Sequence, residues 1–282
     1  MKFVKMHGCG NDYIYINLFQ EEETIPDKSE LARTLSNRHF GIGSDGVIFI
    51  SPSSIADFKI EIYNADGSFA EMCGNGIRCA AKFVYDQNIL SVKKPALSIE
   101  SAGSIKYVHL IFQNGKVIAA RVNMGKPELT SSKIPVITSK PKFIRETISV
   151  AKNPNDFYEV TCVSMGNPHC VIFTNDLSQI DLEHVGPLLE HHNLFPKRTN
   201  VEFVQVIRPS LLKMRVWERG AGETLACGTG CCAAVVAGVL NHLTERKVIV
   251  QVPGGELYIT WDHTNGNVYM TGAAETIFEG KI

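Results

Sequence analysis

Two cysteines occupy similar settings in this chain of 282 residues. Cys73 opens the run CGNGIRC (residues 73–79), and Cys227 lies in the run ACGTG (residues 226–230). Residues 231–240 are apolar almost throughout, which predicts a buried helix directly after Cys227. A cysteine at the mouth of such a helix meets the positive end of the backbone dipole, and this favours a thiolate over a thiol.

Two such thiols suit the inversion of a carbon acid. One group removes a proton from one face of the carbon, and the other returns a proton to the opposite face. An ordinary thiol has a pKa of about 8.5, and we expect the helix N-termini to lower it into the working range. The backbone N–H groups after each cysteine are expected to hold a substrate carboxylate and to stabilise the charge that grows as the proton leaves. These N–H groups belong to Gly74, Asn75, Gly76, Gly228, Thr229 and Gly230.

The second half of the sequence matches the first in order and spacing. Asn64 precedes Cys73 by nine residues, and Glu218 precedes Cys227 by nine. Further matches pair residues 46–49 with 200–203, 6–11 with 165–169, and 114–115 with 265–266. Chance could supply one match but not a whole ordered set, so we infer an internal duplication.

The duplication predicts two pseudo-symmetric domains of mixed α/β class, each with strands wrapped around a central helix. The boundary is placed at the turn residues near 124–127, which gives halves of 1–124 and 125–272. The tail, 273–282, is expected to close back on the first half. The two cysteines are then expected on opposite sides of one cleft.

Local patterns predict the main elements. Strands are expected at 11–16, 47–50 and 58–63, and helices at 27–39 and from Cys73 to about Asn88. Asn-Gly pairs at 114–115 and 265–266 each lie between β-type runs and predict turns there.

Bulk composition limits the choice of partners. The chain is 44% hydrophobic and 20% charged, with a net charge of −1, so nothing in its charge favours nucleic acid or an anionic membrane. It shows no apolar run of membrane-spanning length and no signal peptide, so we expect a cytoplasmic protein.

The chain has eight cysteines, and free thiols are expected in a cytoplasmic protein of this size. No C-x-x-C pair or other ligand spacing predicts a metal site. Six cysteines are interpreted as packing residues: Cys9, Cys79, Cys162, Cys170, Cys231 and Cys232.

Several short motifs together resemble the diaminopimelate epimerase family, over essentially the whole chain. They are GND (10–12), NADGS (64–68), CGNGIRC (73–79), GNPH (166–169), TNVE (199–202), WERGAGET (217–224), ACGTG (226–230) and MTGAA (270–274).

The resemblance implies an epimerase that interconverts LL- and meso-2,6-diaminopimelate, in lysine and cell-wall precursor biosynthesis, without a cofactor. By this likeness Cys73 and Cys227 are the acid/base pair.

Asn64, Asn167, Asn200 and Arg219 match positions that hold the distal end of the substrate. Arginine suits that task because its fork pairs with a carboxylate through two contacts. Glu218 matches a residue at the distal ammonium and near the reaction centre, His169 one near the thiols, and Asn11 a substrate-side amide. The family fold also implies two α/β domains, and a homodimer.

One position departs from part of the family, because some members carry glutamine where this chain has Gly46.

Plainer interpretations stay open for single residues. The four asparagines (Asn11, Asn64, Asn167 and Asn200) could be turn residues, Arg219 a surface charge and His169 a structural histidine. For the whole chain, the alternatives are another two-cysteine racemase or epimerase, of the proline or hydroxyproline type, and a non-catalytic binding or redox module with paired thiols.

Overall fold

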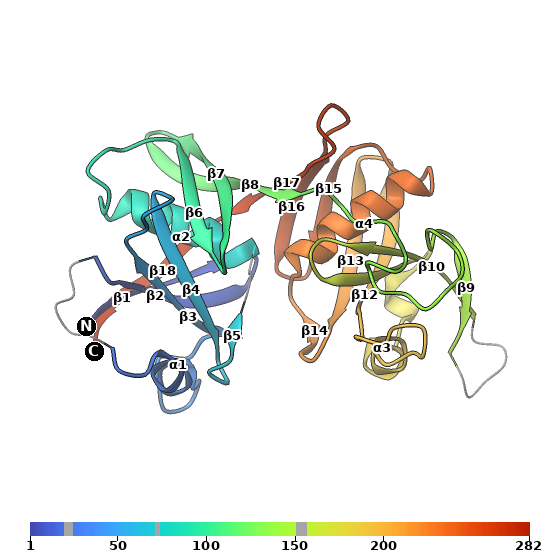
Figure 1. Cartoon of the computed structure of the whole chain (residues 1–282), viewed down its shortest axis with the longest axis horizontal. Coiled ribbons are helices and arrows are strands. Elements are labelled where there is room, and N and C mark those ends of the chain that lie inside the picture. The colour runs from blue at the N-terminus through green and yellow to red at the C-terminus, as the bar shows by residue number, and fades with distance from the viewer. Residues whose placement is uncertain (20–24, 71–73, 151–156) are drawn as a thin grey trace. The chain divides into compact units, whose positions relative to one another are not determined.

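The computed structural model describes residues 1–19, 25–70, 74–150 and 157–282. By its contacts the chain divides into two compact units. Unit 1 comprises Met1–Asn123 and Thr271–Ile282, and unit 2 comprises Met124–Met270. The mixed α+β class expected from the sequence is confirmed (Figure 1).

The strands of unit 1 form one continuous series of pairings, β18–β1–β2–β3–β4–β6–β7–β8. The β2–β3 and β4–β6 pairs are parallel and the other described pairs are antiparallel. Their bounds are β1 (Lys2–Gly8), β2 (Asn11–Asn17), β3 (Gly46–Ser51), β4 (Phe58–Asn64), β6 (Ala96–Ser101), β7 (Ser104–Gln113), β8 (Lys116–Gly125) and β18 (Glu275–Lys281), with the short β5 (Phe69–Ala70) on β4. The β1–β18 pair brings the two chain ends together, and the Met1 amino group donates to the Ile282 carbonyl at 2.8 Å (Figure 1).

Two helices belong to unit 1. Helix α1 (Lys28–Ser36) begins at Asp27, whose side chain accepts from the Glu30 N–H. The helix ends before residue 39, where the sequence predicted its end, because Asn37 leaves the helical conformation. The Asn37 side chain then accepts from the N–H groups of His39 and Phe40. Helix α2 (Gly74–Asp86) is buried along most of its length and packs on β1, β2, β3 and β7.

The strands of unit 2 repeat this order as β9–β10–β11–β12–β13–β15–β16. The β11–β12 and β13–β15 pairs are parallel, and the others are antiparallel. Their bounds are β9 (Glu146–Ser149), β10 (Phe157–Ser164), β11 (Pro168–Phe173), β12 (Asn200–Arg208), β13 (Leu211–Glu218), β15 (Lys247–Val252) and β16 (Gly255–Trp261), with β14 (Gly222–Thr224) on β13 and β17 (Val268–Ala273) leading back toward unit 1.

Helix α4 (Gly228–Leu240) is the central helix of unit 2. It packs on β10, β11, β12 and β16, and its residues from Cys231 to Gly238 are all buried. This confirms the buried helix expected after Cys227. Helix α3 (Leu182–Glu190) and a short 3₁₀ turn, η1 (Leu177–Gln179), cover the β12–β13 side of the unit.

The strand registers place the duplicated residues in equivalent positions. Tyr13 lies opposite Gly46 in the parallel β2–β3 pair, and His169 lies opposite Asn200 in the parallel β11–β12 pair. The two units therefore carry one architecture, as the repeat in the sequence predicts. The predicted hairpin at 114–115 joins β7 to β8, where Asn114 and Gly115 both have positive φ.

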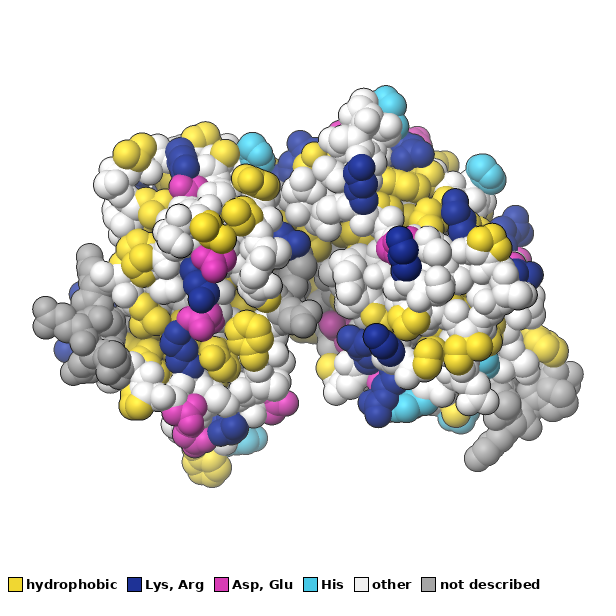
Figure 2. Space-filling view, viewed as in Figure 1, with side chains coloured by type: hydrophobic (Ala, Val, Ile, Leu, Met, Phe, Trp, Pro, Cys, Tyr) yellow, Lys and Arg dark blue, Asp and Glu magenta, His cyan; other side chains and the backbone are white. Residues whose placement is uncertain are grey.

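On the face drawn in Figure 2, acidic and basic side chains alternate over unit 1 without forming a single-sign patch. This agrees with the net charge of −1. Among the helices of the described ranges, none combines the length and the apolar character needed to cross a membrane.

Candidate active site

Cys227 is the N-cap residue of α4. Its Sγ accepts from the Gly230 N–H at 3.4 Å and lies 3.4 Å from the Thr229 hydroxyl oxygen. The side chain is held at the open end of the buried helix, with only 5% of the residue exposed. The expected placement of this cysteine at a helix mouth is therefore what the structure has.

Two carboxylates surround the Cys227 thiol. Burial raises the pKa of Cys227 well above its ordinary value, and the negative charges of Glu218 and Glu202 raise it further. Hydrogen bonds from Thr229 and the Gly230 N–H lower this pKa, but by less. The expectation that the helix mouth lowers the pKa of Cys227 is therefore wrong, because desolvation and two nearby carboxylates outweigh the helix donors.

Glu218 ends β13 and also has an altered acidity. Partial burial raises the pKa of this carboxyl, while hydrogen bonds from the Thr224 hydroxyl and the Cys227 thiol lower it by less. A carboxylate that accepts from a thiol can also take its proton. The structure thus places the Glu218 carboxylate as a hydrogen-bond acceptor for the Cys227 thiol within unit 2.

Arg219 follows Glu218 in an exposed loop. Its backbone N–H donates to Oδ1 of Asn200 at 3.0 Å, and its guanidinium donates to the Lys197 carbonyl at 3.1 Å. The Nδ2 of Asn200 donates to the Pro168 carbonyl at 2.8 Å. Both the oxygen and the nitrogen of the Asn200 amide are thus hydrogen-bonded to backbone groups. In this structure the Asn200 side chain therefore supports the loop that carries Arg219.

Glu190, at the end of α3, was not among the residues expected from the sequence. It is buried, and its two carboxylate oxygens accept from the Trp217 indole N–H at 2.8 Å and from the Gly220 N–H at 3.1 Å. Glu190 therefore holds the residue before Glu218, which is Trp217, and the residue after Arg219, which is Gly220. Nothing in the pattern of an amphipathic helix distinguishes such a carboxylate from a surface one.

Asn167 and His169 lie together beside the first turn of α4. The Asn167 Oδ1 is 3.1 Å from Nε2 of His169, and its Nδ2 donates to the Thr229 hydroxyl oxygen at 3.2 Å. His169 is fully buried, and its Nδ1 is 2.6 Å from Oε1 of Glu202. The sequence singled out Glu202 only as the last residue of the TNVE motif (199–202), with no role of its own. A carboxylate within a run of buried residues on β12 is the signal that points to a functional role.

Cys73 lies outside the described residues. The three residues after it, Gly74, Asn75 and Gly76, form the buried first turn of α2. The Gly74 carbonyl accepts from the fully buried Arg78 at 3.4 Å, and the Gly76 carbonyl accepts from the Tyr15 hydroxyl at 3.1 Å.

The asparagines of unit 1 have different surroundings. Asn11 donates from Nδ2 to Asp45 at 2.7 Å and accepts from Asn75 at 3.5 Å, so it lies beside the start of α2. Asn64 donates from Nδ2 to the Ser68 hydroxyl at 3.0 Å in the turn after β4. The turn interpretation thus describes the present contacts of Asn64, and a role toward substrate stays a prediction for both.

Gly46 is required by close packing. A Cβ at this position would lie 2.1 Å from the Tyr63 carbonyl oxygen and 2.9 Å from the Tyr13 ring. A glutamine here would need β3 and β4 to move apart. The departure from those family members that carry glutamine is therefore part of how this chain packs.

The remaining cysteines share one environment. All seven cysteines in the described ranges are buried free thiols, and no group of metal-ligating side chains occurs within those ranges. Cys162 and Cys170 lie opposite each other on β10 and β11.

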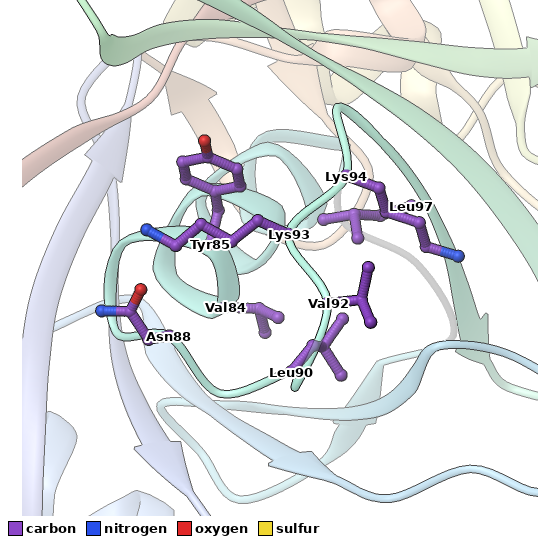
Figure 3. A pocket seen from close by; sticks show the side chains of 8 residues that line it. All are labelled: Val84, Tyr85, Asn88, Leu90, Val92, Lys93, Lys94 and Leu97. Atoms are coloured by element: carbon purple, nitrogen blue, oxygen red, sulfur yellow. The ribbon is translucent and has the colours of Figure 1, made fainter.

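A pocket beside the end of α2 holds none of the expected site residues (Figure 3). It is lined by Val84, Tyr85, Asn88, Leu90, Val92, Lys93, Lys94 and Leu97. Its lysines are already engaged, Lys93 over the Tyr85 ring and Lys94 with Asp57 at 2.6 Å.

Solved structures show which class of fold this is. A phenazine biosynthesis protein of the PhzF family from Bacillus anthracis matches with a TM-score of 0.70 and 15% identity, covering 100% of this chain and 98% of that one. A probable proline racemase from Agrobacterium radiobacter matches with a TM-score of 0.70 and 13% identity, covering 100% and 92%. The chain therefore has the two-unit fold found in racemases, epimerases and PhzF proteins.

Sequence relatives narrow this class to one family. The family model for diaminopimelate epimerase matches residues 3–130 and 161–277. A diaminopimelate epimerase from Acetivibrio thermocellus is 52% identical over 282 residues, covering 100% of this chain and 98% of the relative. One from Methanococcus maripaludis is 50% identical over 283 residues, covering 100% and 99%. The chain belongs to the diaminopimelate epimerase family, whose members are isomerases acting on amino acids, and the resemblance seen in the sequence is confirmed.

Proposed function

We propose that this protein interconverts LL- and meso-2,6-diaminopimelate by two-base proton transfer, with Cys73 and Cys227 as the two bases and no cofactor. The observation that carries the proposal is the placement of Cys227, which caps α4 and contacts Glu218, Thr229 and the Gly230 N–H. Cys73 stands at the equivalent place in the duplicated sequence. Relatives of about 50% identity over the full length, all named for this activity, support the choice of substrate.

The raised pKa of Cys227 assigns its resting form. A thiol whose pKa is raised keeps its proton at neutral pH, so Cys227 rests as the acid. When the thiolate of Cys73 removes the α-proton from one face of the substrate, the Cys227 S–H delivers a proton to the other face. The configuration of the α-carbon is then inverted, and the negative charge passes to the Cys227 sulfur.

The reverse reaction needs Cys227 as the base. It starts from an enzyme in which both thiols carry a proton: Glu218 accepts the proton of Cys227, which leaves a thiolate on Cys227 and a neutral carboxyl on Glu218, while Cys73 stays a thiol. That thiolate then takes the α-proton of the other isomer, and the Cys73 thiol reprotonates the carbanion on the opposite face. The raised pKa of Glu218 makes it a better acceptor for the Cys227 proton than an ordinary carboxylate.

The substrate contacts follow the same assignment. The N–H groups of residues 228–229 and 74–76, in the first turns of α4 and α2, suit the α-carboxylate at the reacting centre, while the Gly230 N–H donates to the Cys227 sulfur. Arg219 suits the distal carboxylate, with Asn11, Asn64, Asn167 and Asn200 around the substrate. As in the sequence-based prediction, the assembly proposed is a cytoplasmic homodimer.

Direct conversion of the isomers tests the proposal. Purified, reduced protein is incubated with LL-diaminopimelate without added cofactor, and the isomers are separated by chiral chromatography. We expect the meso isomer to accumulate to an equilibrium mixture, whereas L-proline and trans-4-hydroxy-L-proline stay unchanged. Conversion of proline or hydroxyproline but not of diaminopimelate would replace the proposed substrate.

A further inference from the structure

A continuous chain of polar contacts runs inside unit 2 from a buried carboxylate to the Cys227 sulfur. Oε1 of Glu202 lies 2.6 Å from Nδ1 of His169, whose Nε2 lies 3.1 Å from Oδ1 of Asn167. The Asn167 Nδ2 donates to Oγ1 of Thr229 at 3.2 Å, and that oxygen is 3.4 Å from Sγ of Cys227. Each link lies within hydrogen-bonding distance of the next.

The chemistry of the donors gives this chain a direction. The atoms of the Asn167 amide set it: Oδ1 faces Nε2 of His169, and because an amide oxygen can only accept, the hydrogen of this contact is on Nε2. With Oδ1 toward the ring, Nδ2 of the same amide points to Thr229 and donates to its hydroxyl oxygen. Since Thr229 accepts from that Nδ2, its own hydroxyl hydrogen is available to the sulfur of Cys227.

Within the part of the chain that the structure describes, His169 is the one hydrogen-bond partner of the Glu202 side chain. This carboxylate is fully buried, and among the described residues its second oxygen, Oε2, has no hydrogen-bond partner. A buried carboxylate with one partner is costly to keep. The equivalent positions in unit 1, by strand register, hold Ile48 for Glu202 and Tyr13 for His169. The pair is therefore not needed to build this fold, because unit 1 builds it without one.

We propose that Glu202 is a positioning residue for the epimerisation: through His169 and Asn167 it orients the Thr229 hydroxyl to donate to the thiolate form of Cys227. When Cys227 is a thiol, its S–H donates to Glu218, and a lone pair of the sulfur still accepts from the Thr229 hydroxyl. One hydroxyl thus serves both protonation states that a two-base mechanism needs. The inference rests on the proposed function for its meaning in catalysis, but the contacts themselves do not depend on the substrate.

The charged groups that face Cys227 come from three strands. Glu218 ends β13, Glu202 lies on β12, and His169, on β11, pairs with Glu202. Both carboxylates raise the pKa of the thiol, whereas Thr229 and the Gly230 N–H lower it. The Thr229 hydrogen bond is therefore one of the two local contacts that stabilise the thiolate.

A double-mutant cycle separates positioning from a general structural effect. The intact protein is alkylated with iodoacetamide across a pH series, and the peptide that contains Cys227 is quantified by mass spectrometry. Thr229→Val removes the hydroxyl and keeps the shape, so it is expected to raise the pH midpoint of Cys227 alkylation by about one unit. In a Glu202→Leu background, where the hydroxyl is no longer oriented, the same change is expected to shift the midpoint by less than about 0.3 units.

The control is Thr229→Ser, which keeps the hydroxyl and should keep the midpoint of the unchanged protein. Circular dichroism establishes that each variant is folded. If Glu202→Leu does not fold, Asn167→Ala takes its place, because it cuts the chain of contacts at a half-buried residue. Equal shifts from Thr229→Val in both backgrounds would overturn the proposal. Alkylation uses no substrate, so this result is independent of whether diaminopimelate is the substrate.

Discussion

Gly230 and Glu202 meet at the first turn of α4: a Cβ on Gly230 would lie 2.7 Å from Oε1 of Glu202. The absence of a side chain at Gly230 therefore lets the buried carboxylate reach His169 under the helix. Gly230→Ala should displace Glu202 and lower the free energy of unfolding by about 1–3 kcal/mol, as overpacked buried sites do. Urea unfolding measures this. Unchanged stability would mean that the carboxylate moves aside at no cost.

Glu218→Gln tests the carboxylate that contacts the thiol. Removing its negative charge lowers the pKa of Cys227, so alkylation of Cys227 should reach its midpoint at a lower pH than in the unchanged protein. Because glutamine cannot take the thiol proton, epimerase activity should fall by about 10²–10⁴-fold. The control is Glu223→Gln, since Glu223 pairs with Arg215 nearby on the surface. A variant that keeps full activity would remove Glu218 from the mechanism.

Alkaline pH should destabilise the protein through Cys227. The pKa of this thiol is raised in the folded state, so the unfolded chain loses the proton first as pH rises. Stability is then fully present below the unfolded pKa, about 8.5, and declines above it by up to about 1.4 kcal/mol per pH unit for this one group. Serine does not titrate in this range, so Cys227→Ser should show a shallower decline. Urea unfolding at pH 7.5, 9 and 10 compares the two, and parallel curves would contradict the raised pKa.

Glu190→Gln tests the anchor of the Arg219 loop. Glutamine has one acceptor oxygen in place of two, so it cannot accept from both Trp217 and Gly220. The loop should then hold Arg219 less firmly, and KM for diaminopimelate should rise about tenfold with a smaller change in kcat. Steady-state kinetics separates the two. A fall in kcat alone would instead place Glu190 with the reacting groups.

Gly46→Gln introduces the side chain that some family members carry. Its Cβ would lie 2.1 Å from the Tyr63 carbonyl oxygen, so we expect a loss of at least about 2 kcal/mol of stability. Gly103→Ala is the control, because a Cβ there meets no atom within 4 Å and costs only the strain of its positive φ. Thermal or urea unfolding compares the two variants, and a smaller loss at Gly46 than at Gly103 would contradict this account.

The sequence predicted the architecture well because the chain is duplicated. The matched spacing around Cys73 and Cys227 indicated two units of one design, and the strand registers show that design twice. Element ends were less predictable. Helix α1 stops at Ser36 because of the Asn37 side chain, a contact that apolar periodicity does not reveal.

The electrostatics around Cys227 could not be predicted from the sequence. A helix mouth alone suggests a lowered thiol pKa at Cys227, yet two carboxylates from separate strands reverse the direction. Glu202 and Glu190 were missed as site residues because their roles depend on contacts between distant parts of the chain. Such contacts exist only once the strands are in register.

Deuterium exchange at the α-carbon tests the two-thiol mechanism most directly. The reduced protein is incubated with LL-diaminopimelate in deuterated water without cofactor, and the α-proton is followed by NMR beside Cys73→Ala and Cys227→Ala. The account predicts deuterium uptake with formation of the meso isomer, and the loss of this epimerisation in both variants. Full epimerisation in either variant, or conversion without deuterium uptake, would contradict it.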